Sequence, residues 1–246
     1  LTFVAGRDAD GSGTGITQSL IFSIIIKDSY IYVSMSADGS ACGQTAGTAS
    51  GCELQVYDVS SSTNPVYVAG RDADGSTGGS TVNTFYDLTI SSNYLYVTSG
   101  GDIYTCGQTA GSANSCELHV YNISSSSNPV FVAGRDVDGS SVGNGANDQS
   151  GAFSASVSGN YLYLGVQASS TPCSQVIGSA SGCELQTYDI SSSSNPLYVA
   201  GRDSSGSRDG TGAKDVYSLS VANNYLYVGK DASSNACTQT AGGAEG

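Results

Sequence analysis

The sequence predicts an all-β fold built from about four copies of one four-stranded unit. The phrase Val-Ala-Gly-Arg-Asp recurs along the chain, other short phrases recur in step with it, and no segment carries apolar residues at helical spacing. The phrase ends at Asp8, Asp72, Asp136 and Asp203, at intervals of 64, 64 and 67 residues. These recurrences divide one repeat domain, 1–246, into units 9–72, 73–136 and 137–203, with partial units 1–8 and 204–246.

The second unit shows the four expected strands most clearly. Alternating apolar and polar residues place them at 85–91, 94–98, 117–123 and 130–134. A Ser-Ser-Asn turn separates the first two strands, and a Ser-rich turn ending in Asn-Pro separates the last two. The unit therefore predicts two antiparallel hairpins joined into one sheet.

The same alternation predicts that both faces of each sheet are apolar. One expected face is aliphatic and comprises Leu88, Ile90, Leu95, Val97, Leu118, Val120, Val130 and Val132. The other is aromatic and comprises Tyr94, Tyr96, Tyr121 and Phe131. A sheet that is half exposed should have one polar face, so sheets apolar on both faces must lie between neighbours. Four-stranded sheets packed face to face around an axis form a β-propeller, which is the predicted architecture.

Several phrases carry a family resemblance. Residues 53–60 read Glu-Leu-Gln-Val-Tyr-Asp-Val-Ser, Asn64-Pro65 leads the next strand at 66–70, and residues 88–97 form a Leu-Thr-Ile-Ser-Ser-Asn-Tyr-Leu-Tyr-Val hairpin. This pattern resembles the LVIVD-type propeller repeat over nearly the whole chain, although each unit here has a longer loop bracketed by cysteines. The resemblance implies a propeller fold and a secreted or surface location.

Composition narrows the classes of partner. The formal net charge is −13 and only 12% of residues are charged, which argues against nucleic acid and against anionic lipid. The longest apolar stretch, 20–26, is too short to span a bilayer. The expected partners are other copies of the chain, a continuation of the repeat array, or a glycan.

Six of the seven cysteines form pairs with nine residues between them, once per unit. The predicted disulfides are Cys42–Cys52, Cys106–Cys116 and Cys173–Cys183, and Cys237 is predicted to be unpaired. Disulfides in this number indicate an extracellular or cell-surface protein.

The Asp-rich loops suggest calcium as the one candidate cofactor. Alternating oxygen ligands on a turn that contains glycine suit a hard cation, although the glutamate at position twelve of an EF-hand is absent. A plain turn with solvated carboxylates is the alternative. The candidate ligands are Asp8, Asp10 and Ser12, then Asp72, Asp74 and Ser76, then Asp136, Asp138 and Ser140.

Cross-strand ion pairs are predicted at the edge of each sheet. If the last two strands pair symmetrically about their turn, Tyr57 faces Tyr67 and Glu53 faces Arg71. The sister pairs are Glu117 with Arg135 and Glu184 with Arg202. An anion-binding role for these arginines is the alternative.

Catalytic machinery is not apparent. His119 is the only histidine and replaces Gln55 and Gln186 of the sister units, so it is interpreted as a structural residue. The sequon at Asn122 is interpreted as a turn cap. The acids found in one unit only are scattered, at Asp102, Asp148, Asp209 and Asp215.

The expected function is therefore non-enzymatic. The first hypothesis is an extracellular structural or adhesive repeat module within a longer surface protein or filament. The second is a carbohydrate- or ligand-binding propeller of the lectin type, and the third is an enzyme acting on polysaccharide. The last unit lacks its third strand, which predicts that the array continues or that a neighbouring chain donates this strand.

Overall fold

The computed structural model describes residues 20–36, 52–61, 63–72, 84–100, 116–137, 151–167, 183–202 and 215–231. In these residues the regular structure is entirely β, as the sequence predicts. No helix in the described ranges is long and apolar enough to cross a membrane.

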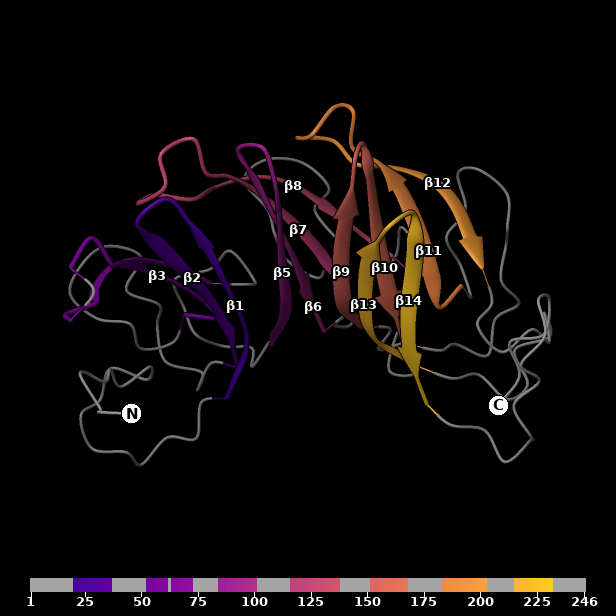
Figure 1. The fold of residues 1–246 in the computed structure, drawn as a ribbon, viewed down its shortest axis with the longest axis horizontal. Coiled ribbons are helices and arrows are strands. Elements are labelled where there is room, and N and C mark those ends of the chain that lie inside the picture. The colour runs from indigo at the N-terminus through magenta and orange to yellow at the C-terminus, as the bar shows by residue number, and fades with distance from the viewer. Residues whose placement is uncertain are drawn as a thin grey trace.

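The strands form antiparallel sheets that follow the repeat (Figure 1). The first sheet contains β1 (Ile21–Lys27), β2 (Tyr30–Met35), β3 (Leu54–Asp58) and β4 (Val66–Arg71). The second contains β5 (Phe85–Ser91), β6 (Tyr94–Ser99), β7 (Leu118–Asn122) and β8 (Val130–Arg135). The third contains β9 (Ala152–Ser158), β10 (Tyr161–Val166), β11 (Leu185–Asp189) and β12 (Leu197–Arg202). The described part of the last sheet consists of β13 (Val216–Ala222) and β14 (Tyr225–Lys230).

Two-residue turns close the first hairpin of every sheet. The first turn residue has a positive φ in each case: 55° at Asp28, 56° at Ser92, 57° at Gly159 and 51° at Asn223. Only small polar residues and glycine adopt this conformation readily, and two-residue hairpins require it. The turn sequence therefore fixes the register of each hairpin.

The side chains on the two faces of each sheet are not divided into aliphatic and aromatic as predicted. In the second sheet Leu95 pairs with Tyr121, and Tyr121 pairs with Phe131, so these side chains share one face. Tyr96 pairs with Val120 on the opposite face. The prediction was wrong because neighbouring strands place an aromatic side chain beside an aliphatic one, so each face combines both kinds.

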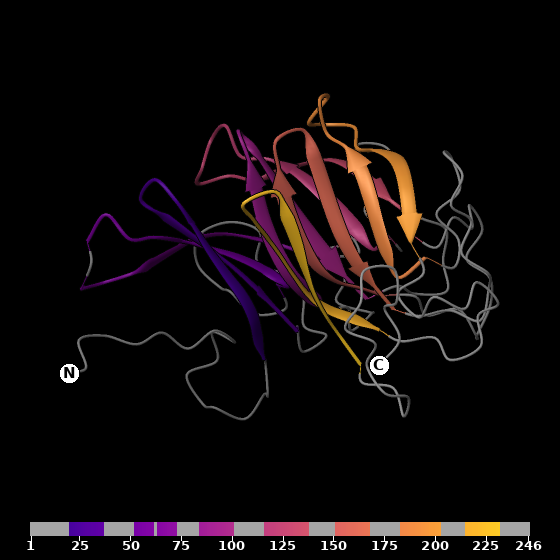
Figure 2. The same ribbon diagram turned by 45° about the vertical axis from the view of Figure 1, so that its right-hand side comes forward.

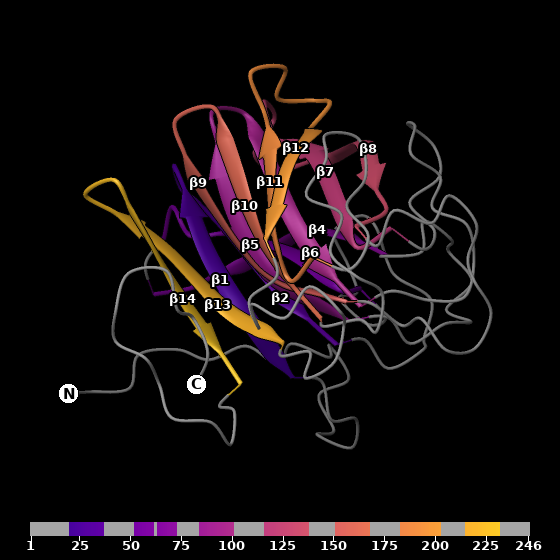
Figure 3. The same cartoon turned by 90° about the vertical axis from the view of Figure 1, so that its right-hand side faces the viewer.

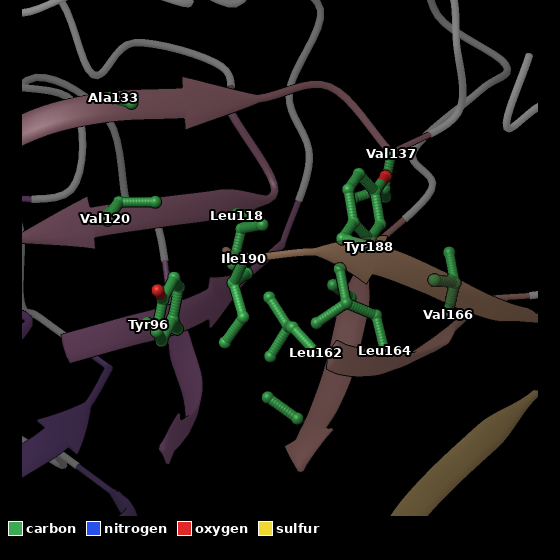
Figure 4. Close-up of a cluster of buried hydrophobic side chains, with 12 residues drawn as sticks. Tyr96, Leu118, Val120, Ala133, Val137, Leu162, Leu164, Val166, Tyr188 and Ile190 are labelled. Carbon is green, nitrogen blue, oxygen red and sulfur yellow. The ribbon is translucent and has the colours of Figure 1, made fainter. Parts of the chain in front are cut away.

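We call the face with Leu88 and Leu95 the leading face and the face with Tyr94 and Tyr96 the trailing face, and use the same names for the matching faces of the other sheets. The trailing face of each four-stranded sheet packs on the leading face of the next. One buried cluster joins the first sheet to the second, and another joins the second to the third (Figure 4). Tyr96, Leu118 and Leu162 are fully buried in the latter cluster. The hydrophobic core therefore lies mainly between consecutive sheets.

The arginines that end β4 and β8 reach the next sheet. Arg71 Nε donates to the Pro129 carbonyl at 2.6 Å and Nη2 to Asn128 Oδ1 at 2.5 Å. Arg135 repeats this with the Pro196 carbonyl at 2.8 Å and with Asn195 Oδ1. The Asn-Pro turns thus provide the acceptors that tie consecutive sheets together.

The arginine expected opposite each glutamate stands opposite the next residue of the third strand instead, while the predicted ion pairs themselves stay a prediction. Tyr57 faces Tyr67 as predicted, but a register shift between Val56 and Tyr57 places Arg71 opposite Leu54 instead of Glu53. The same shift places Arg135 opposite Leu118 and Arg202 opposite Leu185. The extra residue in the fourth strand breaks the simple symmetry about the turn on which the prediction relied.

The sheets follow one another as predicted for blades, but no closed ring is seen among the described strands. β1 packs on β5, β5 on β9 and β9 on β13, whereas the strands of the last sheet have no extensive contact with the first. Figures 2 and 3 show the same succession of sheets from two other directions. The predicted repeat of antiparallel sheets is confirmed, and its closure into a propeller stays a prediction.

The arginine contacts give a first testable prediction. Arg135→Met should lower the free energy of unfolding by about 1 kcal/mol, because it removes hydrogen bonds to two acceptors in the next sheet. Arg202→Met is the matched control, since the described bond of Arg202 is to the carbonyl of its own neighbour, Gly201. Urea denaturation followed by circular dichroism measures both, and equal effects of the two substitutions would contradict the proposed tie between sheets.

Candidate functional site

A bulge interrupts the first strand of every sheet, and the extra residue is aromatic each time. In the first sheet Ile21 pairs with Met35 and Ser23 with Ser34, so Phe22 between them has no partner across the ladder. The same irregularity leaves out Tyr86, Phe153 and Tyr217. A bulge adds one residue to a strand and redirects its side chain. Four separate bulges therefore present four aromatic rings.

These rings form one continuous row. The ring centroids of Phe22 and Tyr86 are 5.3 Å apart, those of Tyr86 and Phe153 are 5.1 Å apart, and those of Phe153 and Tyr217 are 5.1 Å apart. The first two contacts are edge-to-face and the third is stacked. The strands that carry them, β1, β5, β9 and β13, follow one another along the molecule (Figure 1).

The row lines a cavity of about 440 Å³, which we call the aromatic groove. Its lining residues are Phe22, Tyr86, Asp87, Phe153, Ser154, Tyr217, Ser218 and Leu219. Phe22 is 45% exposed and Tyr217 is 51% exposed, so the rings at the two ends of the row are open to solvent. A cavity of this size, with apolar walls and a few polar groups, is typical of small-molecule sites.

Asp87 is the one acid in the wall of the groove. Its Oδ1 accepts from Ser23 Oγ at 2.8 Å and from the Leu88 amide at 2.8 Å, and its Oδ2 accepts from the Ala155 amide at 2.9 Å. Asp87 therefore links the first strands of three sheets. A carboxylate offers about four acceptor positions, so one remains for a ligand donor.

The two tyrosine hydroxyls of the groove are neutral at physiological pH. Burial raises the pKa of Tyr86 above its ordinary value. The pKa of Tyr217 is also raised, chiefly because its hydroxyl donates to Asp215 Oδ2 at 3.0 Å. Each ring thus combines a flat apolar face with a polar tip.

The groove can hold a ligand that has flat apolar faces and hydrogen-bonding groups at their edges. No group of three His, Cys, Asp or Glu side chains within the described ranges is placed to bind a metal ion. The one histidine, His119, is buried on β7, the strand between β6 and β8 in the second sheet.

The predicted disulfides are partly visible. Cys52, Cys116 and Cys183 are each disulfide-bonded and buried. Their predicted partners Cys42, Cys106 and Cys173 lie outside the described residues, as does Cys237, so the pairing itself stays a prediction.

Only two of the candidate calcium ligands fall within the described residues. Asp72 and Asp136 directly follow β4 and β8, and Asp72 is buried. The other seven candidates lie outside the described ranges. The calcium site therefore stays a prediction.

His119 occupies the glutamine position of the sister sheets, and it makes one of the same contacts. Its Nε2 lies 2.6 Å from the Cys116 carbonyl, as Gln186 Nε2 lies 3.1 Å from the Cys183 carbonyl. The carbonyl can only accept, so Nε2 carries the proton. Burial lowers the pKa of His119 to about 4, and His119 Nδ1 is buried without a hydrogen-bond partner.

Asn122 acts as a turn cap. Its Oδ1 accepts from the Ser124 amide at 2.8 Å, just as Asp58 and Asp189 accept from Ser60 and Ser191 at 2.7 Å. These backbone hydrogen bonds lower the pKa of Asp58 and Asp189. Of the acids found in one unit only, Asp215 accepts from Tyr217, while Asp102, Asp148 and Asp209 lie outside the described residues.

The aromatic groove itself was missed by the sequence analysis. Its signal is present, because the four aromatic residues are 64, 67 and 64 positions apart and so keep the spacing of the repeat. Asp87 also stands where the sister units have Ser23, Ser154 and Ser218. Aligning the first strands of the units would have shown both features, although only the bulges bring the rings to one surface.

No protein-family model matches the sequence, and no curated protein matches it. Among solved structures, the computationally designed Ika4 protein is similar at a TM-score of 0.41 and 15% identity, over 92% of each chain. The computationally designed Ika8 protein is similar at a TM-score of 0.40 and 14% identity, over 85% of this chain. The matched region spans 42% of the Ika8 chain.

Proposed function

We propose that this chain is an extracellular adhesive module that binds a neutral carbohydrate in the aromatic groove. The observation that carries the proposal is the row of four rings, each placed by its own bulge. A bulge leaves one residue of a strand without a cross-strand partner. All four sheets have such a bulge in the first strand, and the unpaired residue is aromatic each time. A sugar ring presents a flat C–H face to an aromatic ring and hydroxyls at its edge, which is the complement of this surface.

Charge favours a neutral sugar over an acidic one. The formal net charge is −13, and the acid in the wall of the groove is Asp87. An acidic saccharide would be repelled by both, whereas the hydroxyl of a neutral sugar can donate to a carboxylate.

The extracellular location is supported by the cysteines. Three buried cysteines at the same position in three sheets are disulfide-bonded, and disulfides persist in oxidising compartments. The resemblance to LVIVD-type repeats agrees with this location. We expect no catalytic activity.

A glycan array followed by calorimetric titration with the best neutral oligosaccharide tests the proposal. Tyr217→Ala should weaken binding by about tenfold, equivalent to about 1.4 kcal/mol, because it removes one stacking face. Tyr217 is half exposed, so its loss should leave the fold intact. Tyr161→Ala is the matched control, since Tyr161 is 45% exposed on β10 and lies outside the lining of the groove.

Two results would count against carbohydrate binding. The first is a silent array with folded protein, and the second is equal weakening by Tyr217→Ala and Tyr161→Ala. A silent array would favour the second candidate, a structural repeat module in a longer surface protein or filament. That candidate is supported by the identical arginine contacts between consecutive sheets.

A further inference from the structure

One interface recurs inside the chain. The trailing face of the first sheet, with Tyr32 and Val56, packs on the leading face of the second, with Leu88 and Leu95. The trailing face of the second sheet, with Tyr96, then packs on the leading face of the third in the same manner. The pairing is always between unlike faces, so the interface has a direction.

Hydrogen bonds make this interface specific. Tyr32 donates its hydroxyl proton to the Ser126 carbonyl at 2.8 Å, across the boundary between the first two sheets. Tyr96 donates in the same way to the Ser193 carbonyl at 2.9 Å, across the next boundary. The tyrosines of a trailing face therefore recognise the turn of the following sheet as well as its apolar surface.

One half of this interface is uncovered on the first sheet. Ile24 and Ile26 lie on its leading face and are 57% and 63% exposed. Leu88, which stands at the position of Ile24 in the second sheet, is 5% exposed because the first sheet covers it. The leading face of the first sheet thus presents an exposed aliphatic surface, whereas the leading faces of the second and third sheets are covered by a trailing face.

The other half is uncovered on the last sheet. Tyr225 and Tyr227 lie on its trailing face and are 69% and 57% exposed. Tyr96, which stands at the position of Tyr227 in the second sheet, is fully buried. The last sheet therefore presents the tyrosines that bind a leading face elsewhere.

We propose that the trailing face of the last sheet binds the leading face of the first sheet in a second copy of the chain. The two open surfaces are the two halves of an interface that the chain already forms between its own sheets. Because the halves differ, association is head to tail, and such a contact forms rings if it closes and filaments if it does not. The contact is apolar while each copy carries a formal net charge of −13, so salt should strengthen it by screening the repulsion.

Sedimentation velocity of two variants and their mixture tests this proposal. Ile24→Asp with Ile26→Asp should abolish self-association, and so should Tyr225→Asp with Tyr227→Asp. Each double variant keeps the half that the other has lost. An equimolar mixture should therefore form a one-to-one heterodimer that grows no further. The unchanged chain should form larger species as its concentration rises.

Leu197→Asp is the control for adding a charge at an exposed apolar position. Leu197 is 56% exposed on β12, and the matching Val130 is 52% exposed although its sheet is covered on both faces, so this position lies outside the interfaces. Leu197→Asp should associate like the unchanged chain. The proposal is overturned if the unchanged chain stays monomeric at all concentrations and salt levels. It is also overturned if either double variant still dimerises alone, which would indicate pairing of like faces.

Discussion

Replacing Gly70 with alanine is expected to lower the free energy of unfolding by about 2 to 3 kcal/mol. A β-carbon at this position would lie within 2.9 Å of Cys52 Cβ and still closer to Cys52 Sγ and the Tyr67 hydroxyl. Cys52 is disulfide-bonded and buried, so it has little freedom to move aside. The glycine of the recurring Val-Ala-Gly-Arg phrase is thus explained by the close approach of a cysteine. Urea denaturation under non-reducing conditions measures the effect.

Three further variants separate this explanation from a general intolerance of alanine. Gly201→Ala should behave like Gly70→Ala, because it meets Cys183 and Tyr198 in the same way. Gly100→Ala should be nearly neutral, since its nearest neighbour would be 3.6 Å away. Tyr67→Phe should partly rescue Gly70→Ala by removing one of the three close atoms. The explanation fails if Gly70→Ala and Gly100→Ala cost the same.

His119→Gln is expected to stabilise the protein, and the gain should be larger in acid. At neutral pH the glutamine should gain about 1 kcal/mol. The reason is that it can accept from Tyr121 as Gln55 accepts from Tyr57 at 2.6 Å and Gln186 from Tyr188 at 2.8 Å. His119 Nδ1 has no such partner.

The acid dependence follows from the buried imidazole. The pKa of His119 is lowered to about 4 from an ordinary value of 6.5. Between these values the unfolded chain binds a proton that the folded chain does not, so stability falls as the pH is lowered from 6.5 toward 4. At pH 5 this amounts to about 2 kcal/mol. The difference in unfolding free energy between His119→Gln and the unchanged chain should widen by that amount from pH 7.5 to pH 5. Parallel pH profiles would contradict the assignment.

The sequence predicted the strands closely where side chains alternate without interruption. The strand expected at 85–91 matches β5 (Phe85–Ser91), and the others of that unit agree within one residue at each end. Alternation and turn residues are local signals, and the repeat supplied several copies of each. Short-range pattern was therefore sufficient for strands and for their order in the sheet.

The bulges could not be predicted in the same way, and they account for the errors at the site. One extra residue in β4 placed Arg71 opposite Leu54 in place of Glu53, and one extra residue in each first strand produced the aromatic row. A bulge depends on how two strands pair, which alternation within one strand does not encode. The recurrence of Phe22, Tyr86, Phe153 and Tyr217 was visible in the sequence, but their meeting at one surface depends on packing between sheets.

The arginine contacts between sheets have a consequence for how the molecule folds and unfolds. Each joins residues about one repeat apart, as Arg71 does with Pro129 and Arg135 with Pro196. When every unit is held only by its immediate neighbours, stability behaves as a one-dimensional sum of unit and nearest-neighbour contributions. An interior unit then contacts two neighbours and a terminal unit contacts one. Unfolding should therefore begin at the terminal units and proceed inward. Each unit added to such an array would strengthen the one before it.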